Sequence, residues 1–439
     1  MFNKIINTFG TKIAAAILNF AIAVVISQML GDVGKGVQSL MLTTISFILI
    51  FAEIVCGESV VFLASRHPFS KIFVPSVLWA LLISVVMGIG VALFSPGVSP
   101  NMVAHIAVLS FIASASAINF RFLIGKEEIR KANYNTLLQP VLIALTVIIY
   151  YVVLKKSDIY GYVIGLYLAY GCSFLLGVWM LRDEYKALRL FALKEYKAVL
   201  ADLFKYGFLN QTGHFVQFFN LRLNYYLLYA YMDEGRVGVY SNAVSLAEAI
   251  WIISNSIALV QYARISNVDD RAYSQRLTLQ LGKICLLVSS CAVLALALLP
   301  SAFYCFVFGP EFGEMSGLIR ILAPGVLLYC IFLILGHYYS GTGRYQMNTF
   351  AALCGLLMTC VLGFTLIPRF DIRGAALTAS VAYSVNALFL LVMFVRESRF
   401  RCRDFLLTRQ ELKDYLTEAK RRLGAEKKKD YELRQDAEK

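Results

Sequence analysis

The residues of this chain that could do chemistry are polar side chains set at helical spacing inside long apolar segments. Groups three or four positions apart share one helix face, so most members of each set point the same way. Ionisable groups at membrane depth are costly and usually face a cavity or a partner. We therefore expect these faces to line a polar cavity. Ten such residues stand out: Lys12, Asn19, Glu53, Asn210, His214, Gln217, Arg222, Asn224, Glu248 and Asn255.

Most of these residues also have a structural interpretation. Asn19 and Asn255 could join neighbouring helices through hydrogen bonds, and Lys12 could extend to the membrane surface. Glu53 and Glu248 could be structural partners of Arg or Lys, and a lone His such as His214 often only hydrogen-bonds. Arg222 is the exception. It lies near the middle of its apolar segment and well around the helix from the other polar residues, which favours a functional role.

Neither a metal site nor a catalytic motif is expected. The chain has nine cysteines, an odd number, with no Cys-x-x-Cys pair and no His at ligand spacing. Most of them lie within apolar runs, where a thiol behaves as a small apolar group. The predicted outer loops are short and carry no paired carboxylates. We predict no cofactor, no metal, no disulfide and no catalytic residue.

The elements that would position these residues are membrane-spanning helices. Hydrophobic residues make up 59 % of the 439 positions and charged residues 16 %, against about 25 % charged in soluble domains. This excludes a soluble enzyme, a secreted disulfide scaffold and a disordered protein. A spanning helix needs roughly 20 apolar residues. Twelve segments qualify: about 13–30, 38–62, 73–95, 102–123, 134–154, 159–181, 207–231, 238–262, 278–300, 316–340, 348–368 and 373–395.

The positive charges predict the orientation. With the N-terminus inside, cytoplasmic segments hold 33 of the 41 Lys and Arg residues, whereas outer loops hold six, among them Lys35. Basic residues accumulate on the cytoplasmic side, so both termini are expected there. The net charge of +13 then reflects topology. No basic stripe interleaved with aromatics predicts nucleic-acid binding.

Short matches between the two halves predict an internal duplication. Gly36-Val37-x-Ser39 matches Gly238-Val239-x-Ser241 at an offset of 202, and Asp158-Ile159-x-Gly161 matches Asp371-Ile372-x-Gly374 at an offset of 213. Two further matches share the second offset. Since six spans per half return the chain to the same side, the halves are expected to be two parallel six-helix lobes related by a pseudo-twofold. The predicted parts are a lobe at 1–181, an amphipathic cytoplasmic linker at 182–206, a second lobe at 207–396 and a charged cytoplasmic tail at 397–439.

Three glycine-containing stretches carry a family resemblance. They are Leu30-Gly31-Asp32-Val33-Gly34-Lys35-Gly36, Phe308-Gly309-Pro310-Glu311-Phe312 and Gly341-Thr342-Gly343-Arg344. With them the chain resembles the polysaccharide transporter, or O-antigen flippase-like, family of the multidrug/oligosaccharidyl-lipid/polysaccharide exporter superfamily. The resemblance extends to about residue 396.

This resemblance implies a flippase of the bacterial inner membrane that works by alternating access, and not an enzyme. Its cargo would be a polyprenyl-pyrophosphate-linked oligosaccharide for surface polysaccharide synthesis. Its partners would be membrane lipids, a polysaccharide polymerase and glycosyltransferases. Lys12 and Arg222 would attract the pyrophosphate, amides such as Asn210 and Gln217 would meet sugar hydroxyls, and Glu53 or Glu248 would couple an ion.

Two alternatives stay open. One is a cation-coupled multidrug antiporter of the same superfamily, which would favour an acidic, aromatic cavity. The other is a membrane glycan polymerase, ligase or acyltransferase, which usually presents catalytic groups on large outer loops.

Overall fold

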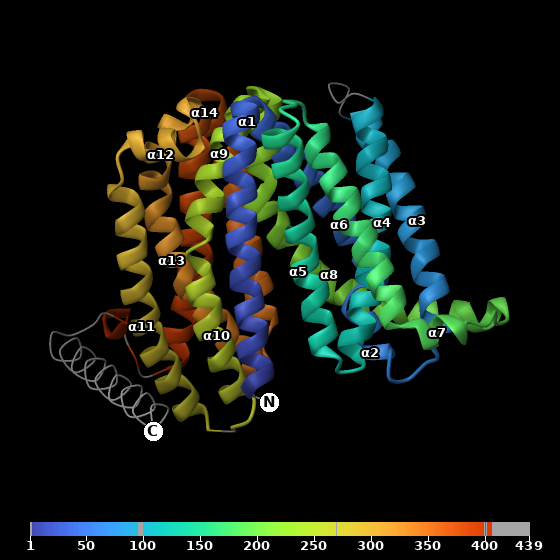
Figure 1. Ribbon diagram of the computed structural model, residues 1–439. Coiled ribbons are helices and arrows are strands. Elements are labelled where there is room, and N and C mark those ends of the chain that lie inside the picture. The colour runs from blue at the N-terminus through green and yellow to red at the C-terminus, as the bar shows by residue number, and fades with distance from the viewer. Residues whose placement is uncertain (1, 95–99, 269, 399, 401, 406–439) are drawn as a thin grey trace, which may run out of the picture.

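The protein is an all-helical membrane protein. The computed structural model describes residues 2–94, 100–268, 270–398, 400 and 402–405, and Figure 1 shows their arrangement. Nine helical segments among these residues are long and apolar enough to cross a membrane, which confirms the multi-pass prediction. The helices are α1 (Phe2–Cys56), α2 (Glu58–Leu63), α3 (Phe69–Phe94), α4 (Pro100–Gly125), α5 (Ile129–Val147), the π-helix η1 (Ile148–Val153), α6 (Tyr160–Met180), α7 (Arg182–Lys186), α8 (Leu193–Tyr231), α9 (Glu234–Glu248), α10 (Trp251–Ile265), α11 (Arg271–Leu298), α12 (Ser301–Phe308), the 3₁₀ helix η2 (Pro310–Glu314), α13 (Met315–Gly341), α14 (Gln346–Glu397) and the 3₁₀ helix η3 (Cys402–Phe405).

Two of these helices are each long enough to cross a bilayer twice. α1 has 55 residues and α14 has 52, whereas one crossing takes roughly 20. Each contains one residue with positive φ, Gly31 at 66° and Asp371 at 56°, and both helices reverse at the upper end of the bundle (Figure 1). Glycine adopts this conformation without steric cost. In Asp371 the same conformation is sterically strained. Its carboxylate lies 3.0 Å from Nε of Arg236, which holds it in place.

The buried apolar side chains form three clusters that divide along the chain. The largest draws its buried members from residues 225–405, and the other two draw theirs from residues 22–169 and 55–203. In Figure 1 helices α9 to α14 accordingly gather on one side and α3 to α6 on the other. The start of α1 and the short helix η3 both lie toward the lower end of the bundle.

Helices α1 and α9 touch through their backbones. A methyl group on Gly36 would lie 1.7 Å from the carbonyl oxygen of Glu234, and one on Gly238 would lie 2.0 Å from the carbonyl oxygen of Asp32. Glycine is therefore required on both helices. The contact is reciprocal, because Asp32 and Glu234 are separated by the same 202 positions as the two glycines.

A hydrogen bond one turn further along extends this contact. The hydroxyls of Ser39 and Ser241 lie 2.8 Å apart and are also 202 residues apart in sequence. Both serines are buried. The residues of the repeated Gly-Val-x-Ser sequence thus meet their own counterparts across one interface.

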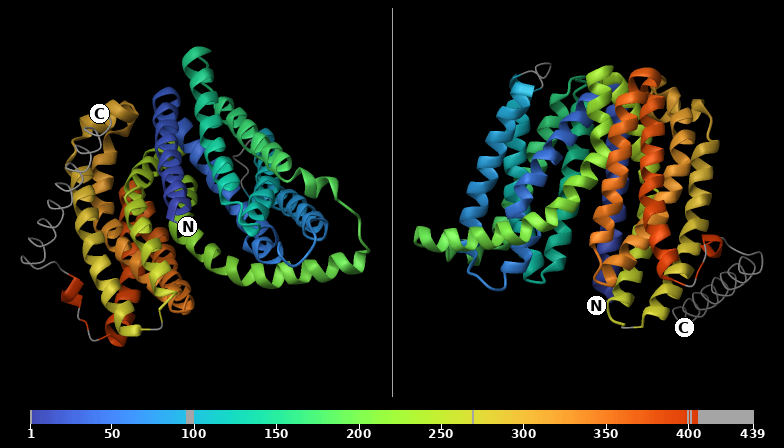
Figure 2. Two further views of the ribbon diagram at one scale, coloured as in Figure 1. Left: turned by 60° about the horizontal axis from the view of Figure 1, so that its bottom comes forward. Right: turned by 180° about the vertical axis from the view of Figure 1, so that it is seen from behind.

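Helix α8 connects the two sides of the bundle. The expected linker at 182–206 is not a separate element beyond α7, since α8 begins at Leu193 and continues without a break to Tyr231. Figure 2 shows it curving along the lower end of the bundle from α7 before it enters the bundle. Gly207 lets it pass close to α1, because a methyl group there would lie 1.6 Å from the carbonyl oxygen of Ile54.

The two ends of this linker region differ in exposure. Val199 and Leu203 are buried, whereas Leu190 and Leu193 are 83 % and 69 % exposed. The predicted tail at 397–439 lies outside the described residues beyond Phe405. Phe405 is buried, and its ring packs edge-on against that of Phe394, with the ring centroids 5.8 Å apart.

The glycine contact predicts a local sensitivity to added volume. Gly238→Ala should lower the free energy of unfolding by about 1–3 kcal/mol, the usual cost of overpacking, because the new methyl group forces α1 and α9 apart. Thermal unfolding of the detergent-purified protein measures this. Gly171→Ala is the matched control, since a methyl group on Gly171 meets nothing within 4 Å. Equal melting temperatures for the two variants would contradict the prediction.

Candidate functional site

A polar cavity of about 430 Å³ lies between the second half of α1 and helices α8 and α9. Its walls combine basic, amide and hydroxyl groups with a few apolar side chains. The lining residues are Lys35, Gln38, Ser39, Leu42, Thr43, Ser46, His214, Gln217, Phe218, Leu221, Arg222, Tyr225 and Ser245.

Three of the ten residues singled out in the sequence line this cavity: His214, Gln217 and Arg222. They lie on α8 together with Leu221 and Tyr225, whereas Asn210 and Asn224 of the same predicted stripe do not line this cavity. Gln217 also donates a hydrogen bond from Nε2 to the Tyr329 hydroxyl at 2.5 Å. The amide thereby joins the cavity wall to α13.

The other seven residues lie elsewhere. Four are exposed and are not among the cavity-lining residues: Lys12, Asn19, Asn210 and Asn255. Asn224 is 1 % exposed and donates to the Tyr240 hydroxyl at 3.2 Å and to the Ala375 carbonyl at 3.3 Å. It joins α8 to α9 and α14, as expected for an amide that holds helices together.

Arg222 lines the cavity as one half of an ion pair. Its Nη1 and Nη2 donate to the two carboxylate oxygens of Glu248 at 3.1 and 2.8 Å. The Tyr383 hydroxyl donates to the same carboxylate at 3.0 Å. Paired guanidinium and carboxylate groups form strong, geometrically specific contacts. Glu248 therefore neutralises the charge of Arg222, and the three side chains tie together α8, α9 and α14.

Lys35 is the cation of the cavity that has no carboxylate partner within the described part of the chain. It is 5 % exposed, and its Nζ donates to Gln38 Oε1 at 2.5 Å. No described Asp or Glu oxygen lies within the 4.0 Å that defines an ion pair with it. A buried ammonium group without a counter-charge is unfavourable, so an anion bound in the cavity would stabilise the charged form of Lys35.

Sequence reasoning missed Lys35 because it was expected in a loop. The helix resumes directly after Gly31, so Lys35 occupies its first turn. A periodic signal was available, since Lys35, Gln38, Leu42 and Ser46 follow helical spacing. All four line the cavity.

Glu53 belongs to a separate cluster. Its carboxylate accepts a hydrogen bond from Gln211 Nε2 at 3.1 Å and lies 3.6 Å from the Arg121 guanidinium. Arg121 also forms an ion pair with Glu58. The cluster joins α1, α2, α4 and α8, and none of its members is among the cavity-lining residues.

An aromatic cluster adjoins the cavity. The Phe218 ring, part of the cavity lining, stacks on Phe47 with centroids 5.7 Å apart. Phe47 also contacts Phe51 and Phe219 edge-on.

The described residues contain no group of three or more His, Cys, Asp or Glu side chains placed to hold a metal ion.

The Arg222–Glu248 pair predicts non-additive stability effects. Arg222→Met or Glu248→Met should each lower the free energy of unfolding by about 1–3 kcal/mol, because each leaves a partly buried charge without its partner. The double variant should be more stable than either single one. Lys131→Met is the control, because that residue forms an exposed pair with Glu128. Melting temperatures of the purified variants test this, and additive losses would contradict it.

Comparisons with known proteins address the fold. No protein-family model matches the chain. It is 26 % identical over 152 residues to the capsular polysaccharide biosynthesis protein CapF of Staphylococcus aureus, a match that covers 34 % of this chain and 38 % of CapF. The matched region thus spans less than half the length of this relative.

Solved structures match over far more of the chain. The lipid II flippase MurJ in an inward closed conformation superposes with a TM-score of 0.73 at 18 % identity, covering 90 % of this chain and 88 % of MurJ. An inward-facing MATE-family multidrug transporter gives 0.69 at 16 % identity, covering 87 % and 94 %. These likenesses confirm the resemblance seen in the sequence: the chain has the fold that MurJ shares with MATE transporters of the MOP superfamily.

Proposed function

We propose that this protein is a flippase that moves a polyprenyl-pyrophosphate-linked oligosaccharide from the cytoplasmic to the periplasmic leaflet of the bacterial inner membrane. The observation that carries the proposal is the buried, uncompensated Lys35 at the wall of the polar cavity. A pyrophosphate supplies the missing negative charge, and the attraction is strong in surroundings of low dielectric constant.

The rest of the lining suits a glycan. Hydroxyl groups from α1 and the His214 and Gln217 side chains from α8 line the same cavity as Lys35. Such groups both donate and accept hydrogen bonds, as sugar hydroxyls do. Arg222 contributes its open N–H groups, but its charge is already matched by Glu248. The polyprenyl chain would remain in the bilayer.

The proposed architecture has twelve spans in two lobes, 1–181 and 207–396, with both termini cytoplasmic. Twelve spans result when α1 and α14 each count twice, α9 and α10 count together, and the second part of α8 counts once. The reciprocal contact of Gly36 with Gly238 supports a parallel pseudo-twofold between the lobes. Alternating access would then tilt one lobe against the other, while glycosyltransferases supply the cargo and a polymerase consumes it.

Ion coupling through Glu53 or Glu248 would require their present bonds to break. Glu248 would have to release Arg222, and Glu53 would have to release Gln211 and Arg121. Protonation of either carboxylate removes the charge that holds its partner. We propose these two groups as coupling sites for that reason.

A second candidate function is cation-coupled multidrug efflux. The stacked Phe47 and Phe218 rings beside the cavity support it, since aromatic faces attract organic cations. The solved MATE-family transporter with the same fold also supports it. The unmatched charge of Lys35 weighs against a cationic substrate.

Reconstitution tests the proposal. In proteoliposomes with a fluorescent polyprenyl-pyrophosphate-linked oligosaccharide, Lys35→Gln should slow translocation about tenfold or more, the expected cost of losing one charge-assisted hydrogen bond. Lys35→Arg should retain most of the rate. Lys155→Gln, at an exposed lysine outside the cavity, is the matched control.

Either of two outcomes would overturn the proposal. One is wild-type translocation by Lys35→Gln at unchanged protein stability, which would remove the cavity cation from the mechanism. The other is ion-driven transport of a fluorescent organic cation by liposomes that do not move the glycan lipid, which would favour the antiporter.

A further inference from the structure

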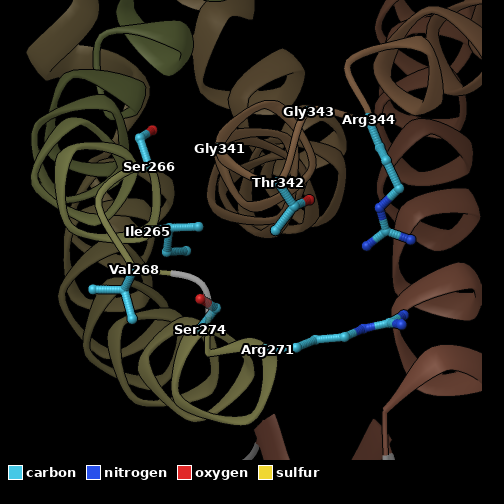
Figure 3. A pocket seen from close by; sticks show the side chains of 9 residues that line it. All are labelled: Ile265, Ser266, Val268, Arg271, Ser274, Gly341, Thr342, Gly343 and Arg344. Atoms are coloured by element: carbon cyan, nitrogen blue, oxygen red, sulfur yellow. The ribbon is translucent and has the colours of Figure 1, made fainter.

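A second cavity opens at the lower end of the bundle, where the turn between α10 and α11 meets the turn between α13 and α14 (Figure 3). Its volume is about 450 Å³. It shares no lining residue with the central cavity. Figure 3 shows Arg271 and Arg344 entering from different turns on one side, with Ile265 and Val268 on the opposite side.

The two arginines share one carboxylate oxygen. Arg271 Nη2 donates to Glu397 Oε2 at 3.2 Å, and Arg344 Nη1 donates to the same atom. One negative charge thus faces two positive charges, so the cluster retains an excess of one. Each guanidinium carries five N–H donors, and the only other side-chain bond within the described residues runs from Arg344 Nη2 to the Tyr338 hydroxyl at 3.5 Å. Several charged donors remain open.

The remaining walls are amphiphilic. The Thr342 hydroxyl donates to the Tyr338 carbonyl at 3.0 Å, and the Ser266 hydroxyl donates to the Tyr262 carbonyl at 2.8 Å. Because each hydroxyl proton is used within its helix, the oxygens can still accept a hydrogen bond from a ligand. Val268 is 41 % exposed and gives the cavity an apolar edge.

We propose that this cavity binds the phosphate of an anionic lipid headgroup. Paired guanidinium groups with an excess positive charge fit a phosphate diester. The hydroxyl oxygens fit a glycerol headgroup, and the apolar edge fits the start of an acyl chain. The cavity lies at the ends of membrane-spanning helices, the depth at which headgroups lie. The ligand occupies the open N–H groups and competes with Glu397 for the shared ones.

Removing an arginine and removing Glu397 should change the affinity for the anionic lipid in opposite directions. Titration of the purified protein with dioleoyl phosphatidylglycerol, followed by native mass spectrometry, measures the affinity. Arg271→Gln and Arg344→Gln should each weaken binding about tenfold, as loss of a charge-assisted hydrogen bond does. Glu397→Gln should strengthen it, because it removes the competing carboxylate. Arg276→Gln is the matched control, since Arg276 is an exposed arginine on the same helix α11.

Several outcomes decide the proposal, with melting temperatures confirming that each variant folds. Weaker binding after Glu397→Gln would overturn it, as would equal losses in Arg271→Gln and Arg276→Gln or equal binding of dioleoyl phosphatidylcholine. Competition by millimolar inorganic phosphate would support the phosphate site and show that free phosphate also enters it. Without competition, recognition extends to the glycerol headgroup. No transport assay is involved, so this site and the proposed flippase activity can fail independently.

Discussion

The backbone contact between α1 and α9 determines where the central cavity can lie. Two helices that approach through glycine leave no room for side chains at the crossing, so the side chains just before and after it define the space around it. Lys35 directly precedes Gly36, and Ser39 with Ser241 follows one turn later. Ser39 therefore belongs both to this interface and to the polar lining of the cavity, which Lys35 also lines. A change of helix packing at this crossing alters the cavity itself.

The charges of the cavity region differ in whether they are compensated. Arg222 is held by Glu248, whose carboxylate also accepts from Tyr383, and this pairing neutralises the charge of a partly buried guanidinium. Lys35 has an amide partner, Gln38, and no carboxylate partner among the described residues. The total charge of the chain says little about this difference. In the proposed function, anion binding would depend on this one buried lysine without a carboxylate partner among the described residues, and not on the many basic residues at the helix ends.

Much of the fold follows from the sequence because its signals are local. Long apolar runs predict spanning helices, and the repeated Gly-Val-x-Ser sequence marks the residues that meet between α1 and α9. The site was only partly predictable. His214 and Gln217 line the cavity from α8, but periodicity could not show that Arg222 and Glu248, 26 residues apart, would pair. Asn224 shares that stripe and yet is buried against α14, because a helix wheel does not show which neighbour covers a face.

The unbroken course of α8 restricts how the two sides of the bundle can move. Leu203 lies in one apolar cluster and Leu228 in another. The part of α8 between these two residues is about 37 Å long at a rise of 1.5 Å per residue. A hydrogen-bonded helix bends gently but does not lengthen. The curved segment therefore allows the two clusters to tilt relative to each other but limits how far they can separate. Any change in its curvature costs elastic energy.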